Sequence, residues 1–161
     1  MSGADTGSDS IRPYTESEII ITAVRIVVPF VLTYGLFITF HGADSPGGGF
    51  QGGALIGVVV LMLAFAFGIR PTREWVGTGL MTGLAAGGVI IFVGVGLGTL
   101  LLGGAFLEYG LYEPFIGPDA TKWGMEAIEI GGVAAIVSGV IMALFFLIAA
   151  GYDASDGGED R

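Results

Sequence analysis

Four long apolar stretches, separated by short polar segments, run along the chain. The first covers residues 19–40 and would reach about 33 Å as an α-helix, enough to cross the hydrocarbon core of a bilayer. The second, residues 53–69, is short for a spanning helix; the third lies within residues 76–104 and the fourth within residues 126–150. This pattern predicts an all-α membrane protein, a bundle of four transmembrane helices.

The polar segments predict where the helices begin. Thr15 and Glu18 have the spacing of a capping box, so we expect the first helix to begin near Thr15. Residues 70–75 read Arg-Pro-Thr-Arg-Glu-Trp. We expect them to form a compact turn in which Thr72 caps the third helix.

Composition supports a membrane protein. The 161 residues are 53% hydrophobic and 13% charged, whereas about a quarter of a soluble domain is charged. The mean hydropathy is +0.81. Thirty glycines without a collagen period are typical of membrane helices whose backbones approach closely.

The acidic residues concentrate at the two ends of the chain. Eight of the fifteen lie in residues 1–18 and 151–161, and such segments cannot bury apolar surface. We therefore expect two short acidic tails around a transmembrane domain of residues 19–150.

Basic residues predict the orientation. Four crossings put both termini and residues 70–75 on one side of the membrane, and residues 41–52 and 105–125 on the other. The first side carries four arginines and the second a single lysine: Arg12, Arg70, Arg73 and Arg161, against Lys122. By the positive-inside rule, both termini of this multi-pass protein lie in the cytoplasm and the protein resides in the cell membrane.

Several classes of site are excluded. With no cysteine and one histidine, we expect no disulfide, iron–sulfur cluster, structural metal site or other cofactor. Six basic residues give no surface for nucleic acid. Residues 47–52 match the GxGxxG pattern of dinucleotide sites, but they join two membrane spans and lack its strand–turn–helix context.

Small residues recur every four positions on two predicted helices, so each set lies on one helix face. The residues are Gly79, Gly83 and Gly87 on the third helix, and Gly131, Ala135, Gly139 and Ala143 on the fourth. Such faces form grooves that accept a neighbouring backbone. Either the bundle packs on them internally, or one receives a helix from another subunit.

Arg25 lies inside the first apolar stretch, where an arginine costs about 2.5–3.5 kcal/mol at mid-membrane. Its side chain could extend to the interface or pair locally with Glu18. Alternatively it points inward, toward a partner's carboxylate or an ion path. Pro29 follows four residues later and loosens the helix at the Arg25 carbonyl.

Glu126 and Glu129 are three residues apart and share a face at the outer end of the fourth helix. One interpretation is a favourable interaction with the helix dipole. The other is that Glu129 faces a hydrated cavity and carries protons or binds sodium.

The polar run between the first two spans is rich in glycine. His41 and Asp44 precede its core and are candidates for titration or cation binding. The core consists of Pro46, Gly47, Gly48, Gly49, Phe50, Gln51, Gly52 and Gly53. The run is either a broken or re-entrant start of the second helix, which meets protein or water, or a flexible external hairpin.

Five segments together suggest a family. They are Arg-Ile-Val-Val-Pro-Phe at 25–30, Gly-Leu-Phe at 35–37, His-Gly at 41–42, Ser-Pro-Gly-Gly-Gly-Phe-Gln-Gly-Gly at 45–53 and Glu-Ile-Gly at 129–131. In these segments the chain resembles the MnhB/MrpB family, the B-type subunits of Mrp-type (Mnh) multisubunit cation/proton antiporters, over roughly residues 17–150. The resemblance implies a small membrane component that supports sodium-for-proton exchange alongside several other subunits.

We therefore expect an integral-membrane subunit of a sodium/proton antiporter, not an enzyme. Arg25, Glu126 and Glu129 are its candidate ion-pathway residues, with His41 and Asp44 nearby. Its expected partners are the other membrane subunits, the lipid bilayer, Na+ and H+. Two alternatives stay open: a B-like module of a redox-driven pump of the membrane-bound hydrogenase type, and a purely structural scaffold subunit.

Overall fold

The computed structural model describes residues 17–42 and 47–156, and in these residues every regular element is a helix. The elements are α1 (Glu18–Phe40), α2 (Gly49–Phe67), α3 (Ile69–Leu101), η1 (Tyr109–Tyr112), α4 (Glu113–Ile116), α5 (Ala120–Glu126), η2 (Ala127–Ala134) and α6 (Ala135–Asp156). Four continuous stretches are long and apolar enough to span a membrane: Glu18–Phe40, Gly49–Phe67, Ile69–Leu101 and Ala120–Gly151. The predicted all-α fold with four spans is confirmed.

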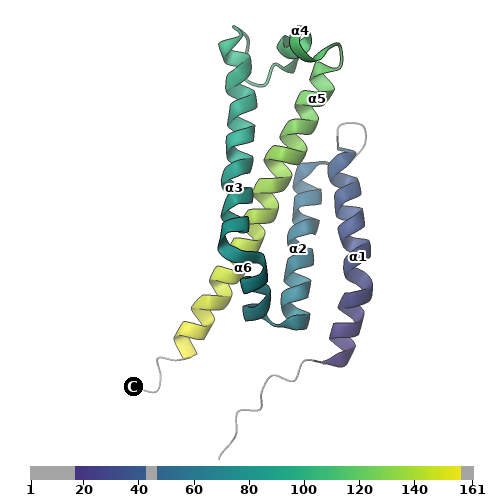
Figure 1. Ribbon diagram of the computed structural model, residues 1–161, viewed down its shortest axis with the longest axis vertical. Coiled ribbons are helices and arrows are strands. Elements are labelled where there is room, and N and C mark those ends of the chain that lie inside the picture. Colours follow the sequence, from purple (N-terminus) through teal and green to yellow (C-terminus); the bar gives the residue numbers. More distant parts are fainter. Residues whose placement is uncertain (1–16, 43–46, 157–161) are drawn as a thin grey trace, which may run out of the picture.

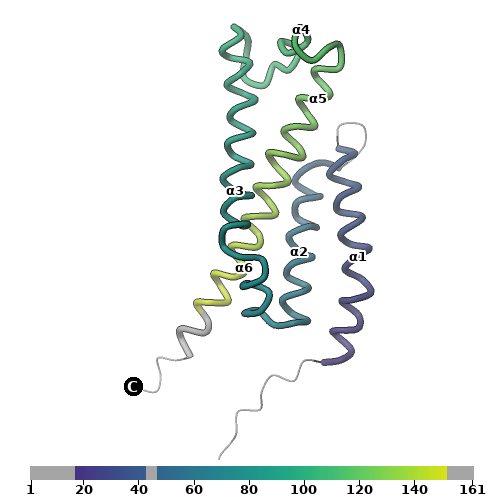
Figure 2. The backbone as a smooth tube through the Cα atoms, viewed as in Figure 1, coloured from purple at the N-terminus to yellow at the C-terminus, as the bar shows by residue number. Residues whose placement is uncertain are grey.

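The helices form an up-and-down bundle. α1 and α2 lie side by side as an antiparallel pair, and α5, η2 and α6 form one oblique column that packs on both α2 and α3 (Figure 1). The trace of the chain places the start of α1, the α2–α3 turn and the end of the described chain at one end of the bundle (Figure 2). We call this the arginine end, because Arg70 and Arg73 lie there.

The fourth span begins earlier than predicted. It starts at Ala120 rather than near Glu126, and its first part contains a π-helical segment, η2, before α6 continues. A π-helix has wider turns than an α-helix, is rare, and is frequently found at functional sites. Nothing in the spacing of apolar residues signalled it.

The prediction of a compact turn at residues 70–75 is wrong, because this segment is the first part of α3. Gly68 makes the reversal alone with φ 97°, a conformation that side chains disfavour. Pro71 fits because the first turn of a helix needs no N–H from it. Thr72 is buried inside the helix, and its own N–H donates to the Gly68 carbonyl. The predicted cap at Thr15 lies outside the described residues, and α1 begins at Glu18.

Gly77 then divides α3 into a short first segment and a long second one. Its φ of 71° and ψ of 144° are not helical, so the helix axis is displaced at this residue. Residues 69–76 consequently sit beside the end of α2, where Val76 joins a buried cluster with Ala64, Met81, Met142 and Phe146. This cluster ties α2, α3 and α6 together near the arginine end.

The glycine ladders divide into two groups. A Cβ atom on Gly139 would lie 2.8 Å from the Met81 carbonyl oxygen of α3, and one on Gly131 would meet Ile91 at 3.2 Å. Among the described residues, by contrast, no atom lies within 4 Å of a Cβ built on Gly79, Gly83 or Gly87. The face of the fourth span thus packs inside the bundle, and the α3 face is open.

The segment between α3 and α5, which we call the outer segment because it lies at the end of the bundle opposite the arginine end, is held on the end of α3. The fully buried Thr99 hydroxyl accepts a hydrogen bond from Leu107 N–H at 3.0 Å and lies 2.8 Å from the carbonyl oxygens of Gly96 and Ala105. The Tyr112 hydroxyl donates to the Val95 carbonyl at 2.7 Å. These bonds position η1 beside the start of the fourth span.

Candidate functional site

Glu129 lies in the π-helical segment η2, opposite the junction of α1 and α2. Its side chain is half-buried, and its Oε2 atom is fully enclosed with no hydrogen-bond partner among the described residues. Leaving a buried polar atom unpaired costs about 1–3 kcal/mol, and more if it is charged. An ionisable group at membrane depth that bears this cost is a candidate functional site.

Glycines of the α1–α2 junction form the wall around this carboxylate. A Cβ atom on Gly42 would overlap Glu129 Oε2, and one on Gly48 would lie 3.5 Å from Oε1. A Cβ on Gly49 would overlap the backbone carbonyl oxygen of Glu129 and lie 3.0 Å from Ala134 N. Any side chain at Gly42 or Gly49 would therefore displace the glutamate or the π-helix that carries it.

The rest of the glycine-rich core is the first turn of α2, where three helices cross. A Cβ on Gly52 would overlap Thr39 Oγ1 of α1 and lie 2.8 Å from the Gly35 carbonyl oxygen. On the other face, a Cβ on Gly53 would lie 2.6 Å from the Ala134 carbonyl oxygen of η2. Thr39 is buried and donates its hydroxyl proton to Gly35 O at 2.8 Å, so its hydroxyl is hydrogen-bonded within α1 at this crossing.

The described part of the motif forms the start of α2 and packs on protein. Gly48 and Gly49 are buried, whereas Phe50 and Gln51 are exposed. Asp44 and Pro46 lie outside the described residues.

Two further groups approach Glu129 from the end of the bundle opposite the arginine end. Glu126 lies one turn before it in the same helical column. Tyr109 of η1 packs its ring over Gly124, where a Cβ would collide with the ring. Burial raises the pKa of the Tyr109 phenol, and the neighbouring Glu129 carboxylate raises it further. The sequence did not single out Tyr109 for this role, because twenty residues separate it from Glu129.

Arg25 belongs to the other end of the bundle. Its guanidinium carbon lies 5.5 Å from the centre of the Phe67 ring, at the last residue of α2. Gly42 lies 17 residues further on, about 25 Å along the helix, so the structure does not bring Arg25 to Glu129. His41 directly precedes Gly42, whose Cα faces the Glu129 carboxylate, and the centre of its ring lies 4.3 Å from that of Phe37 in a stacked arrangement.

The site offers one carboxylate and a glycine backbone rather than a ligand cluster. In residues 17–42 and 47–156, no three His, Asp or Glu side chains come together as a metal site would require. Such an arrangement can take up a proton, or a monovalent cation together with water and backbone carbonyls.

Comparison with known proteins identifies the family. Residues 19–143, which contain the whole site, match the family described as a domain related to the MnhB subunit of Na+/H+ antiporters. The chain belongs to the MnhB family. Family membership makes it a component of a transporter rather than an enzyme.

Curated MnhB relatives match over nearly their full length. A B-type Na(+)/H(+) antiporter subunit of Bacillus subtilis is 26% identical over 133 residues, which are 81% of this chain and 91% of the relative. The protein of the same name from Alkalihalophilus pseudofirmus is 26% identical, over 80% of this chain and 89% of its own. The putative antiporter subunit mnhB2 of Staphylococcus haemolyticus is 25% identical, with 84% and 97% covered.

Proposed function

We propose that this MnhB-family chain is a B-type component of a multisubunit Na+/H+ antiporter in the cytoplasmic membrane, and that Glu129 is its ion-handling group. In this proposal a proton or a sodium ion occupies the enclosed side of the carboxylate during exchange. Because the glycine-rich motif has no side chains at Gly48 and Gly49, the backbone of α2 can lie against Glu129. Glu126 continues the polar path from Glu129 toward the outer surface.

The observation that carries the proposal is the enclosed Glu129 Oε2 atom, which has no hydrogen-bond partner among the described residues. A glutamate kept only for stability would be expected to have a hydrogen-bond donor beside it, because buried polar groups are nearly always paired. A transient proton or cation supplies the missing partner. Arg25 and His41 remain candidates for a supporting role: Arg25 at the arginine end, and His41 beside the glycine-rich motif.

The fold also supports dependence on other subunits. α1 packs mainly on α2 and turns large side chains outward: Ile26, Phe30 and Phe37 are 60%, 73% and 54% exposed. The open glycine face of α3 is a second surface that no described residue covers. The relatives are named as antiporter subunits, so we infer that neighbouring subunits share these faces with lipid.

We infer that the arginine end faces the cytoplasm. The start of α1, the α2–α3 turn and the last described residues share that end (Figure 1). Arg70 and Arg73 lie there, whereas Lys122 lies near the opposite end, in α5. Under the positive-inside rule both termini are then cytoplasmic.

A glutamine substitution tests the role of the carboxylate. Glu129→Gln keeps the size of the side chain but can neither lose a proton nor hold a cation by charge. Vesicles containing the whole complex with this variant should lose most Na+-dependent proton movement, while co-purification of the other subunits stays normal. Glu113→Gln, at an exposed position of the outer segment, is the matched control and should leave exchange unchanged. Normal exchange by the Glu129 variant would refute the ion-handling role.

A further inference from the structure

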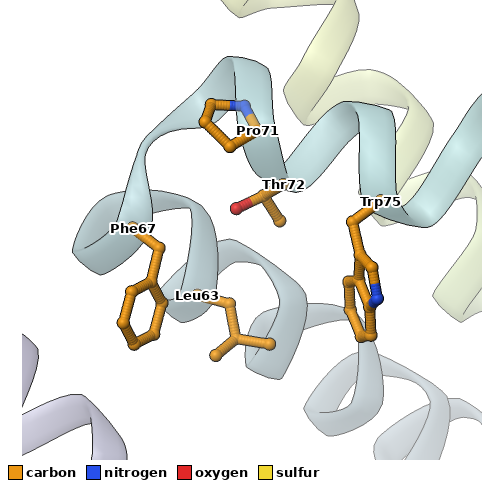
Figure 3. Close-up of a pocket in the computed structure, with 5 residues that line it drawn as sticks. All are labelled: Leu63, Phe67, Pro71, Thr72 and Trp75. Carbon is orange, nitrogen blue, oxygen red and sulfur yellow. The ribbon is translucent and has the colours of Figure 1, made fainter.

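A second feature lies at the arginine end, away from Glu129. Leu63 and Phe67 of α2, with Pro71, Thr72 and Trp75 of α3, enclose a pocket of about 290 Å³. This volume is close to the lower limit of roughly 300–1,000 Å³ that is typical of ligand pockets. Phe67 and Trp75 stand on opposite sides of a common space, with Leu63 between them (Figure 3).

The pocket exists because of the backbone geometry at two glycines. Gly68 reverses the chain in one residue, and Gly77 breaks α3 so that residues 69–76 lie beside the last turn of α2. Large apolar side chains then face one another without filling the space between them. Trp75 is 76% exposed, so one wall of the pocket opens to the surroundings of the bundle.

Positive charge lies against one wall of this apolar space and in two cavities nearby. The Arg25 guanidinium lies over the ring of Phe67, which is a wall of the pocket. Arg70 and Pro71 line an adjoining cavity of about 530 Å³, and Arg70 and Arg73 line a third of about 420 Å³. Among the side chains that the structure describes here, the acidic ones are Glu74, beside the two arginines, and Glu18 in the first turn of α1.

We infer that this pocket binds an anionic phospholipid, with an acyl chain between Phe67 and Trp75 and the phosphate near Arg25. The apolar lining suits a hydrocarbon chain, and a basic pocket between membrane helices suits an anionic headgroup. A tryptophan at the rim matches the level at which headgroups and chains meet. The inference does not depend on the role proposed for Glu129.

The protein contains two tryptophans, which allows a direct test. Trp123→Phe in the full chain leaves Trp75, in the wall of the pocket, as the only tryptophan reporter. This variant would be placed in vesicles of phosphatidylcholine that contain a small, equal fraction of either chain-brominated phosphatidylglycerol or chain-brominated phosphatidylcholine. Bromine quenches tryptophan fluorescence on contact, so the difference between the two lipids measures headgroup preference at the pocket.

We expect stronger quenching by the brominated phosphatidylglycerol. Adding Arg25→Gln should weaken that preference by about fivefold, since one basic residue near a headgroup contributes about that factor. The converse variant, Trp75→Phe, reports from Trp123 at the other end and should show no headgroup preference. Equal quenching of Trp75 by the two brominated lipids would overturn the inference.

The complete complex gives an independent check. A photo-crosslinking amino acid at Leu63, activated in native membranes, should yield an adduct with the mass of a phospholipid. An adduct with another polypeptide would overturn the inference and assign the pocket to a side chain of a neighbouring protein. Both readouts concern binding only, so they are separate from the exchange assay on Glu129.

Discussion

Where α1 meets α2, glycines bring backbone atoms against the Glu129 carboxylate, whereas at the arginine end large side chains of α2 and α3 leave a pocket between them. At the junction of α1 and α2 there is no space for a single added methyl group. At the arginine end, room remains for a ligand. α2 thus takes part in both a polar site that requires close approach of backbones and an apolar site that requires space between side chains.

The largest expected effect is at the crowded end. Gly49→Ala would drive a Cβ into the Glu129 carbonyl oxygen, and backbone atoms cannot rotate away as side chains can. We expect a loss of about 3 kcal/mol, the upper end of the usual overpacking cost, with loss of the protein from the complex. Gly79→Ala is the matched control, because its Cβ would meet no described atom within 4 Å. Thermal unfolding in mild detergent measures both. Similar midpoints for the two variants would contradict the tight contact.

This contrast between glycines shows how far the sequence can be interpreted. Four spans and Glu129 as a candidate follow from hydropathy and from the rarity of carboxylates in apolar stretches. Spacing alone, however, made Gly79, Gly83 and Gly87 look equivalent to Gly131 and Gly139. Only the positions of the neighbouring helices separate them.

The contact between Gly88 and Gly132 shows the same limit. A Cβ on Gly88 would lie 2.7 Å from the Gly132 carbonyl oxygen, so these two residues bring α3 against η2. Neither residue was singled out from the ladders. The π-helix and the helical conformation of residues 70–75 were missed for a related reason. The spacing of apolar residues does not distinguish a π-helix from an α-helix, and Arg-Pro-Thr-Arg-Glu-Trp is compatible with either a turn or the start of a helix.

A smaller effect is expected at the arginine end from Gly77→Ala. The site is open among the described residues, so the cost is only the strain of φ 71°, about 1–3 kcal/mol if the kink persists. If the helix straightens instead, alanine regains roughly 1 kcal/mol of helix propensity, but residues 69–76 leave the end of α2. In both cases we expect lower stability than in Gly79→Ala. If the helix straightens, we also expect weaker quenching of Trp75 by brominated phosphatidylglycerol.

Unchanged quenching in a Gly77→Ala protein whose α3 has straightened would show that the pocket does not depend on the kink. Gly79→Ala is a well-matched control for Gly77→Ala because the two glycines are two residues apart in α3. Of the two, Gly77 alone has a positive φ, and neither has a described neighbour within 4 Å.

The smallest effect concerns Tyr109, which connects the outer segment to the glutamate end. Burial and the Glu129 carboxylate raise its pKa, so the folded protein holds the phenolic proton more tightly than the unfolded chain does. The resulting stability is complete below the ordinary pKa of tyrosine and is lost as pH rises from there through the folded pKa. Removing the negative charge with Glu129→Gln should lower the Tyr109 pKa part of the way, because burial is the larger cause and remains. Absorbance titration near 295 nm, with Tyr109→Phe subtracted to isolate this phenol, measures the shift. If Glu129→Gln leaves the pKa of Tyr109 unchanged, the two groups do not interact, and the outer segment is not part of the glutamate site.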